Sequence, residues 1–344
     1  MPILCGLDIH RKQITFDLLD TETGEVRCGQ VRPADREHLA AWLARFAGQD
    51  AHFAMEGCTG WRYVAEEVTA AGLTAHLADP AQLAGLRGPK RKAKTDRADA
   101  RHERVMLAAG QLPECWIPPS RVLDLRALLE TYLDLRKERT GWIQRVHAVL
   151  YHHGTPSLSG QRLGTPAGQA ALAAAAARCS PAAGQVQVQI AVEIAEALDQ
   201  RLLQVRRQLV TAARHTAGAR ELQARLYGAG PVTALALTCW LGGAGRFSSS
   251  RQAVRFAGLD ITVHSSDAKR SPGHLSRQGP AVLRWAVFES GKAHARRGAP
   301  HYAYYTQVKD RVDGKRAALS VARKILREAH HILAALGDDA LAPC

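Results

Sequence analysis

The sequence predicts an α/β domain followed by a mainly α-helical region. In the first third of the chain, short β-rich segments alternate with segments whose apolar residues recur at helical spacing, an order typical of a mixed sheet flanked by helices. The remainder carries long apolar seams at alternating three- and four-residue spacing, which predict packed helices. A chain of 344 residues is long enough for two or three such units.

The N-terminal elements follow the order β-β-β-α-β-α-β-α. A TETGE turn between the second and third segments predicts an opening three-stranded meander. The expected elements are strands at 2–9, 13–19 and VRCGQV, a helix at 34–47, a strand at 52–57, a helix at 61–71 and a strand at 74–79. Ligands of such sheets bind where strands end, so the chemistry is expected at that edge.

Two apolar seams predict a long helical hairpin, or stalk. One uses Leu125, Leu128, Tyr132, Leu135, Trp142, Val146 and Val149, and the other uses Ile194, Leu198, Val205 and Leu209. The Gly-, Pro- and Ala-rich stretch 154–185 between them is interpreted as a linker or mobile insertion around one Ala-rich helix. Such a stalk can make dimer contacts or be an ordinary intramolecular hairpin. The expected domains are residues 1–115, 116–222 and 223–344.

Composition narrows the choice of partners. The net charge of +14, from 46 Lys and Arg against 32 Asp and Glu, favours a polyanionic partner such as nucleic acid. The seven cysteines form no C-x-x-C pair, which argues against a zinc ribbon or a disulfide framework and indicates reduced, mostly buried thiols. Because the N-terminus has too short an apolar run for a signal peptide and no stretch approaches the roughly 18 apolar residues of a membrane span, a cytoplasmic protein with no membrane partner is expected.

Four carboxylates predict a metal site. Asp8 ends the first predicted strand and Glu56 closes the strand HFAME, so both would project from one edge of the sheet. Asp96 and Asp99 are three residues apart on a predicted helix and share its face. Two hard cations that bridge a scissile phosphate need several oxygen ligands, which suits Mg²⁺. Each acid alone has an ordinary alternative role as a turn or helix cap.

A basic run lies just before the second pair of acids. It includes Lys90, Arg91, Lys92 and Lys94. These side chains would offset the repulsion between the acids and a phosphate backbone, and we expect them to bind nucleic acid. The alternative is a solvated basic loop.

Motifs along nearly the whole chain resemble one known family. GLDIH, AMEGCTGW and KTDRADA, in this order, resemble the RuvC-like DEDD domain, an RNase H-like fold, of the IS110 family of insertion-sequence transposases. Downstream, GAGPVTALAL, FAGL, the Ser265-Ser266 pair and SRQGPAVLRWA resemble the C-terminal transposase domain of that family. The stretch around 154–185 is the least similar part.

The resemblance implies a DNA transposase and recombinase. The metal-binding acids would be Asp8, Glu56, Asp96 and Asp99. Ser266 would attack a DNA phosphate to give a phosphoserine intermediate, which strand exchange and religation resolve. The side chains that stabilise the phosphate charge would include Lys269, Arg270 and Arg277. The family also implies a homo-oligomer, a dimer of dimers, and a structured non-coding bridge RNA that pairs with target and donor DNA.

Two positions depart from the family pattern. Asp267 follows Ser266 where the family usually has glycine, and Tyr227 stands where a proline is common. Neither change removes a group that the chemistry requires, but the first leaves Ser265 as the alternative nucleophile.

Two other functions remain open. A RuvC-like nuclease would use the same acids with water as the nucleophile and leave Ser266 without a role. A non-catalytic helix-hairpin-helix protein would grip the DNA backbone through Gly228–Val232, with structural acids.

Overall fold

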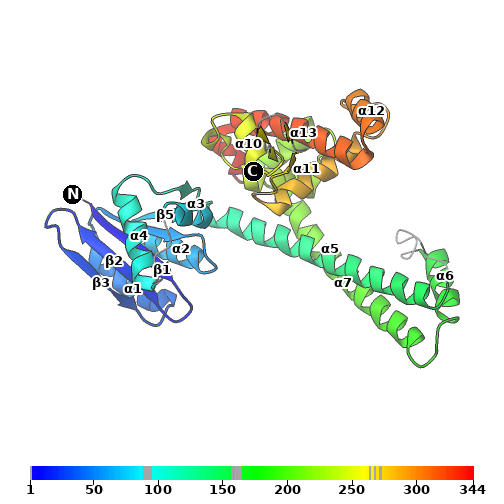
Figure 1. Ribbon diagram of the computed structural model, residues 1–344, viewed down its shortest axis with the longest axis horizontal. Helices are drawn as coiled ribbons and strands as arrows, with labels where there is room; N and C mark the ends of the chain where they lie inside the picture. Colours follow the sequence, from blue (N-terminus) through cyan, green and yellow to red (C-terminus); the bar gives the residue numbers. More distant parts are fainter. Residues whose placement is uncertain are drawn as a thin grey trace. The chain divides into compact units, whose positions relative to one another are not determined.

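The computed structural model describes residues 2–87, 95–155, 158, 165–262, 265–266, 269–270 and 273–344. The chain divides into two compact units, Met1–Ser120 and Arg121–Cys344, so that the boundary falls at the start of helix α5 (Figure 1). The division of the second unit into a stalk and a C-terminal domain at residue 222 stays a prediction.

The first unit contains the expected mixed sheet. Its strands are β1 (Ile3–Ile9), β2 (Ile14–Asp20), β3 (Val26–Val31), β4 (Ala51–Glu56), β5 (Thr74–Ala78) and β6 (Glu114–Cys115). They lie in the order β3-β2-β1-β4-β5-β6, with β1, β4 and β5 parallel and the other pairs antiparallel. This confirms the predicted fold class. Of the strands described in this unit, β6 alone was not predicted, because two residues carry no periodic pattern.

One face of the sheet carries the core of this unit. The helices of the unit are α1 (Arg36–Leu43), α2 (Trp61–Ala70), α3 (Pro80–Gly85) and α4 (Asp96–Ala108), with a 3₁₀ turn at Ala44–Phe46. Alternate side chains such as Cys5, Leu7 and Phe53 are fully buried in a cluster that α1 and α2 complete. Since strand side chains alternate between faces, Asp8 lies on the opposite face.

Helix α4 covers that opposite face. It packs so closely on β1 at Gly6 that a Cβ there would lie 2.0 Å from the Ala100 carbonyl oxygen and 2.7 Å from the Arg104 nitrogen. A buried ion pair, in which Arg104 donates to the Asp17 carboxylate, ties the helix to β2. Glycine at position 6 therefore lets α4 carry its acids to the sheet.

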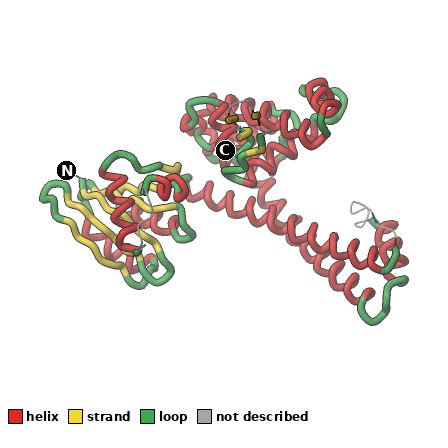
Figure 2. Tube along the Cα trace, in the orientation of Figure 1, coloured by secondary structure: helices red, strands yellow, loops and turns green. Residues whose placement is uncertain are grey.

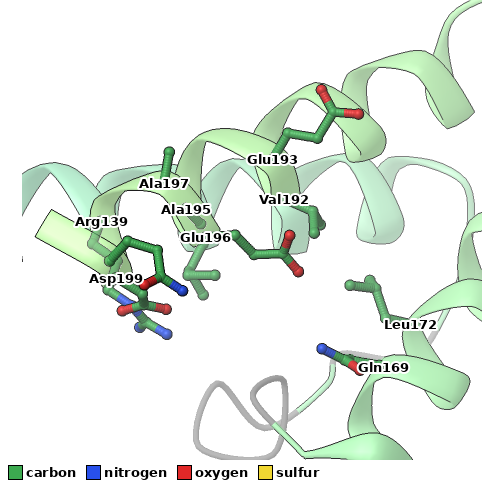
Figure 3. A pocket seen from close by; sticks show the side chains of 11 residues that line it. Arg139, Gln169, Leu172, Val192, Glu193, Ala195, Glu196, Ala197 and Asp199 are labelled. Carbon is green, nitrogen blue, oxygen red and sulfur yellow. The ribbon is translucent and has the colours of Figure 1, made fainter. Parts of the chain in front are cut away.

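The second unit begins with the stalk. Its helices are α5 (Ser120–His152), α6 (Pro166–Ala176) and α7 (Gly184–Arg214), and α5 and α7 run side by side (Figure 1). Arg139 Nε on α5 pairs with Asp199 Oδ1 on α7 at 2.6 Å, beside a pocket that α6 also lines (Figure 3). Leu172 and Ala175 of α6 pack in a core with Val146 and Leu150 of α5. Helix α6 thus lies where one Ala-rich helix was expected, and the interpretation of the surrounding stretch as a linker or insertion stays a prediction.

The rest of the second unit is mainly helical, as expected (Figure 2). Its helices are α8 (Ala217–Arg225), α9 (Pro231–Leu241), α10 (Ser250–Phe256), α11 (Ala281–Ala293), α12 (Tyr302–Arg311) and α13 (Gly314–Leu336), with 3₁₀ turns at Ala244–Arg246 and Gly337–Leu341. Its short strands are β7 (Ile261–Thr262), β8 (Ser265–Ser266), β9 (Lys269–Arg270) and β10 (His274–Leu275). Strand β7 pairs with β10, and β8 pairs with β9. No helix in the described part of the chain has the length and apolar character needed to cross a bilayer.

Candidate functional site

Two of the predicted acids end neighbouring parallel strands. The pairing of β1 with β4 runs from Ile3 opposite Ala51 to Leu7 opposite Met55, so the next residues in this register are Asp8 and Glu56. Paired residues of adjacent strands point to the same face of a sheet. The strand ends therefore place both carboxylates on the face that α4 covers.

The other two acids lie in the first turn of α4. Thr95 caps this helix, and its hydroxyl accepts a hydrogen bond from the Ala98 N–H at 3.2 Å. The helix then begins at Asp96, and Asp99 follows three residues later, still in the first turn. Acidic side chains are favoured there because the unpaired N–H groups of a helix start carry partial positive charge.

Asp8, His10 and Asp96 come together at the edge of the sheet. His10 Nε2 lies 3.1 Å from Asp8 Oδ2 and 3.6 Å from Asp96 Oδ1, and one ligand atom from each of the three residues lies within 4.8 Å of the others. The Asp8 side chain is 9% exposed, whereas those of His10 and Asp96 are about half exposed, at 53% and 45%. The cluster thus has a buried carboxylate at its base and an open side toward solvent.

Polar partners hold the acids of α4. Gln13 Nε2 donates to Asp96 Oδ2 at 3.1 Å, and Arg87, two residues after the end of α3, pairs with Asp99. The structure therefore brings Asp8 and Asp96 into one group, while Asp99 is held by an arginine and Glu56 stands at the neighbouring strand end.

The electrostatics of the site favour a cation. Burial raises the pKa of Asp8; the nearby His10 opposes this shift, and the negative charges of Asp96 and Asp99 add to it. Glu103, one helical turn beyond Asp99, is almost fully buried and accepts a hydrogen bond from the Leu7 N–H at 3.0 Å. Burial raises the pKa of Glu103 well above its usual value, and Glu56 and Asp8 raise it further. Carboxyl groups in this state are stabilised as anions by a bound metal ion.

The residues present fit a divalent metal. Asp8 and Asp96 supply the carboxylate oxygens that Mg²⁺ and Mn²⁺ prefer, and the imidazole of His10 is a ligand that Mn²⁺ accepts more readily than Mg²⁺. The Thr15 hydroxyl, directly opposite Asp8 on β2, is buried and makes no hydrogen bond with the residues that the structure describes. A buried hydroxyl without a hydrogen-bond partner, next to a buried carboxylate, is typical of a site that binds a metal ion together with water.

His10 and Glu103 were missed by the sequence reasoning. His10 follows Asp8 by two residues on an extended segment, so the D-x-H spacing itself places both on one face. Glu103 follows Asp99 by four residues, which puts it on the acidic face of α4. Both signals were readable from spacing alone.

The predicted nucleic-acid contacts fall mostly outside the described side chains. Lys90, Arg91, Lys92 and Lys94 lie in the segment 88–94, outside the described residues. The backbone of Ser266 is described, in β8, where it pairs with Lys269, and Ser265 pairs with Arg270; the side chains of these four residues are outside the description. Arg277 is described and exposed, with a backbone φ of +52°.

Comparisons with known proteins agree with this geometry. Residues 5–154 match a DEDD transposase model of the IS110 type, and residues 220–306 match the model described as "Transposase IS116/IS110/IS902 family". A "Probable family 20 transposase" of Pseudomonas aeruginosa is 26% identical over 247 residues, which are 71% of each chain. Both domain models match in the expected order, the first spanning the whole carboxylate cluster. The chain therefore belongs to the IS110 family of insertion-sequence transposases.

Proposed function

We propose that this transposase cuts and rejoins DNA through a serine nucleophile, assisted by a metal site at Asp8, Glu56, Asp96 and Asp99. The observation that carries the proposal is the meeting of Asp8, His10 and Asp96 within 4.8 Å at the edge of the sheet. Such a cluster, with Glu56 at the adjacent strand end, suits divalent ions bound to a DNA phosphate. We infer Mg²⁺ as the ion, and two ions for the full set of acids.

The proposed covalent step is a transesterification. The Oγ of Ser266 forms a bond to phosphorus, the bond between phosphorus and one deoxyribose oxygen breaks, and the hydroxyl proton passes to that departing oxygen or to a base. Religation reverses the step, with the hydroxyl of another strand as the nucleophile. The energy of the phosphodiester is conserved, so no cofactor is consumed.

Each residue has a specific part in this scheme. The carboxylates would hold the metal, which when bound would neutralise charge on the phosphate oxygens. His10 and Gln13 orient the Asp8 and Asp96 carboxylates through the contacts described above. Lys269, Arg270 and Arg277 accompany Ser266 in the chain, and their cationic side chains suit contacts with the phosphates on either side of the attacked one.

The partners follow from the family and the charge. Members of a transposase family bind DNA, and the net charge of +14 supports a polyanionic partner. We propose in addition a structured guide RNA and a homo-oligomeric assembly on the element ends. The stalk, with two long helices, supports the latter because it offers extended surfaces to a second copy.

A cleavage assay tests the metal site and the serine together. Purified wild type and the variants Asp8→Asn, Ser266→Ala and Asp50→Asn would be incubated with labelled element-end DNA, the flanking non-coding RNA and increasing Mg²⁺. Asp50→Asn is the matched control, because this aspartate is 68% exposed and lies outside the cluster. We expect metal-dependent cleavage in wild type and in the control, and a loss of at least 100-fold in the other two, in keeping with the usual cost of removing a catalytic group.

Different outcomes separate the rival functions. Cleavage that survives in Ser266→Ala but fails in Asp8→Asn would identify a nuclease that uses water. Binding without cleavage in every protein, at every metal concentration, would identify a DNA-binding protein with structural acids. Either result would overturn the proposal.

A further inference from the structure

A groove in the second unit is lined by Arg277, and its other lining residues have no role in the chemistry described so far. It has a volume of about 850 Å³ and lies between β7 and β10 on one side and the end of α12 and the first half of α13 on the other. Strands β7 and β10 pair with each other, and the β8–β9 hairpin with Ser265 and Ser266 lies between them in the chain. We name this feature the arginine groove.

The charge of the groove is positive. Its charged lining residues are Arg277, Arg311, Arg316 and Arg323, and no carboxylate appears among the described residues that line it. In the described part of the chain, neither Arg277 nor Arg311 forms an ion pair, and Arg316 reaches Asp313 only at 3.5 Å. Exposed guanidinium groups without carboxylate partners are available to bind phosphate oxygens.

The backbone at Arg277 is held in an unusual conformation. Its φ of +52° lies in the left-handed region, which side chains other than glycine and asparagine rarely adopt. The turn packs closely against the end of α10. A Cβ added to Gly258 would lie 2.2 Å from the Gln278 oxygen, and one added to Gly279 would lie 1.9 Å from the Phe256 oxygen. Such strain persists where the surrounding structure enforces it, often at binding sites. Here it presents the Arg277 side chain to the groove.

The groove also exposes apolar surface. Ile261 and Val312 are 53% and 50% exposed, and Leu275 and Leu319 contribute to the same lining. A ligand that satisfies this surface must carry both negative charges and flat or apolar groups. Single strands of nucleic acid do so, because their bases are unstacked and can lie on side chains while the phosphates meet cations.

We propose that the arginine groove binds a single-stranded segment of DNA, with phosphates on Arg277 and Arg311 and a base against Ile261 and Val312. A concave pocket of this size takes one or two nucleotides rather than a rigid duplex. Because the lining strands flank the serine hairpin in the chain, the bound segment is the one next to the attacked phosphate. This last point rests on the proposed function.

The test is a binding titration with short oligonucleotides. Fluorescence anisotropy would follow a labelled thymidine 12-mer, the matching duplex and a uridine 12-mer, in EDTA so that no catalysis occurs. The variant is Arg277→Gly with Arg311→Ala; glycine suits the left-handed backbone at 277, so folding is preserved. The control is Arg225→Ala, which removes an exposed arginine of α8 outside the groove.

We expect the double variant to bind single-stranded DNA at least 10-fold more weakly, with the salt dependence of log K reduced by about 1.4, or about 0.7 for each lost phosphate contact. Duplex binding and the control should change less than threefold. Equal losses on duplex and single strand, a loss confined to RNA, or no loss at all would overturn the proposal. Wild-type cleavage of element-end DNA is measured separately. If cleavage is intact but the groove variant binds single-stranded DNA as wild type does, only the binding role of the groove is refuted, and the proposed function stands.

Discussion

Replacing Gly6 by alanine should displace α4 from its position on the sheet. The added Cβ would lie 2.0 Å from the Ala100 oxygen, whereas real Cβ contacts essentially never fall under 3.0 Å. The clashing atoms belong to the backbone, so the helix must move by about an ångström, a displacement that no side-chain rotation can absorb. Overpacking of this kind costs about 1–3 kcal/mol, or roughly 4–12 °C in the melting temperature of a unit of this size.

The effect would be read by calorimetry and by hydrogen exchange of α4 peptides. Because α4 carries Asp96 and Asp99, we also expect metal-dependent cleavage to fall with the melting temperature. Gly85→Ala is the matched control in the same unit: no atom lies within 4 Å of its added Cβ, and alanine favours a helix more than glycine does. An unchanged melting temperature and unchanged α4 exchange in Gly6→Ala would refute the close packing of α4 on β1.

Three further predictions concern titration, metal binding and thiol reactivity. The raised pKa of Glu103 means that the folded protein keeps a proton which the unfolded chain loses. The free energy of unfolding of the metal-free protein should therefore fall as the pH rises from the ordinary glutamate pKa through the raised folded value. Glu103→Gln keeps the acceptor for the Leu7 N–H, and its denaturation midpoint should lack this decline. Mn²⁺ should raise the melting temperature of wild type but not of Asp8→Asn, and an equal rise in both would remove Asp8 from the site. Iodoacetamide should modify the exposed Cys28 and Cys344 before Cys239, because burial raises the pKa of the Cys239 thiol to about 12. Peptide mapping that finds Cys239 modified first in the folded protein would contradict this burial.

The sequence was informative where a periodic pattern spans a whole element. The alternation of Ile3, Cys5 and Leu7 in β1 agrees with a core position for Cys5 and Leu7 and with Asp8 on the opposite face. The three-residue spacing of Asp96 and Asp99 similarly predicted that both acids share one helix face, and the structure places both in the first turn of α4. These inferences depend only on local geometry, which a sequence encodes directly.

Contacts between segments far apart in the sequence were harder to predict. The ion pairs Arg87–Asp99 and Arg104–Asp17 depend on how α4 lies on the sheet. The close packing of α4 at Gly6, which sets this position, is visible only in the folded structure. The burial of the cysteines was also hard to predict. All seven are free, as expected, but only three of the seven are buried, whereas the sequence predicted that most would be. The arginine groove joins residues from β7, β10, α12 and α13, which no single sequence window contains.

The covalent serine intermediate is the most direct test of the proposed chemistry. Wild-type protein would be incubated with Mg²⁺, guide RNA and labelled element-end DNA, denatured, digested and examined by mass spectrometry for a nucleotide attached to a serine. We expect a denaturation-resistant adduct on the peptide with Ser266, absent in Ser266→Ala and in Asp8→Asn. Cleaved DNA without any protein adduct, or an adduct that persists in Ser266→Ala, would contradict the assignment of Ser266 as the nucleophile.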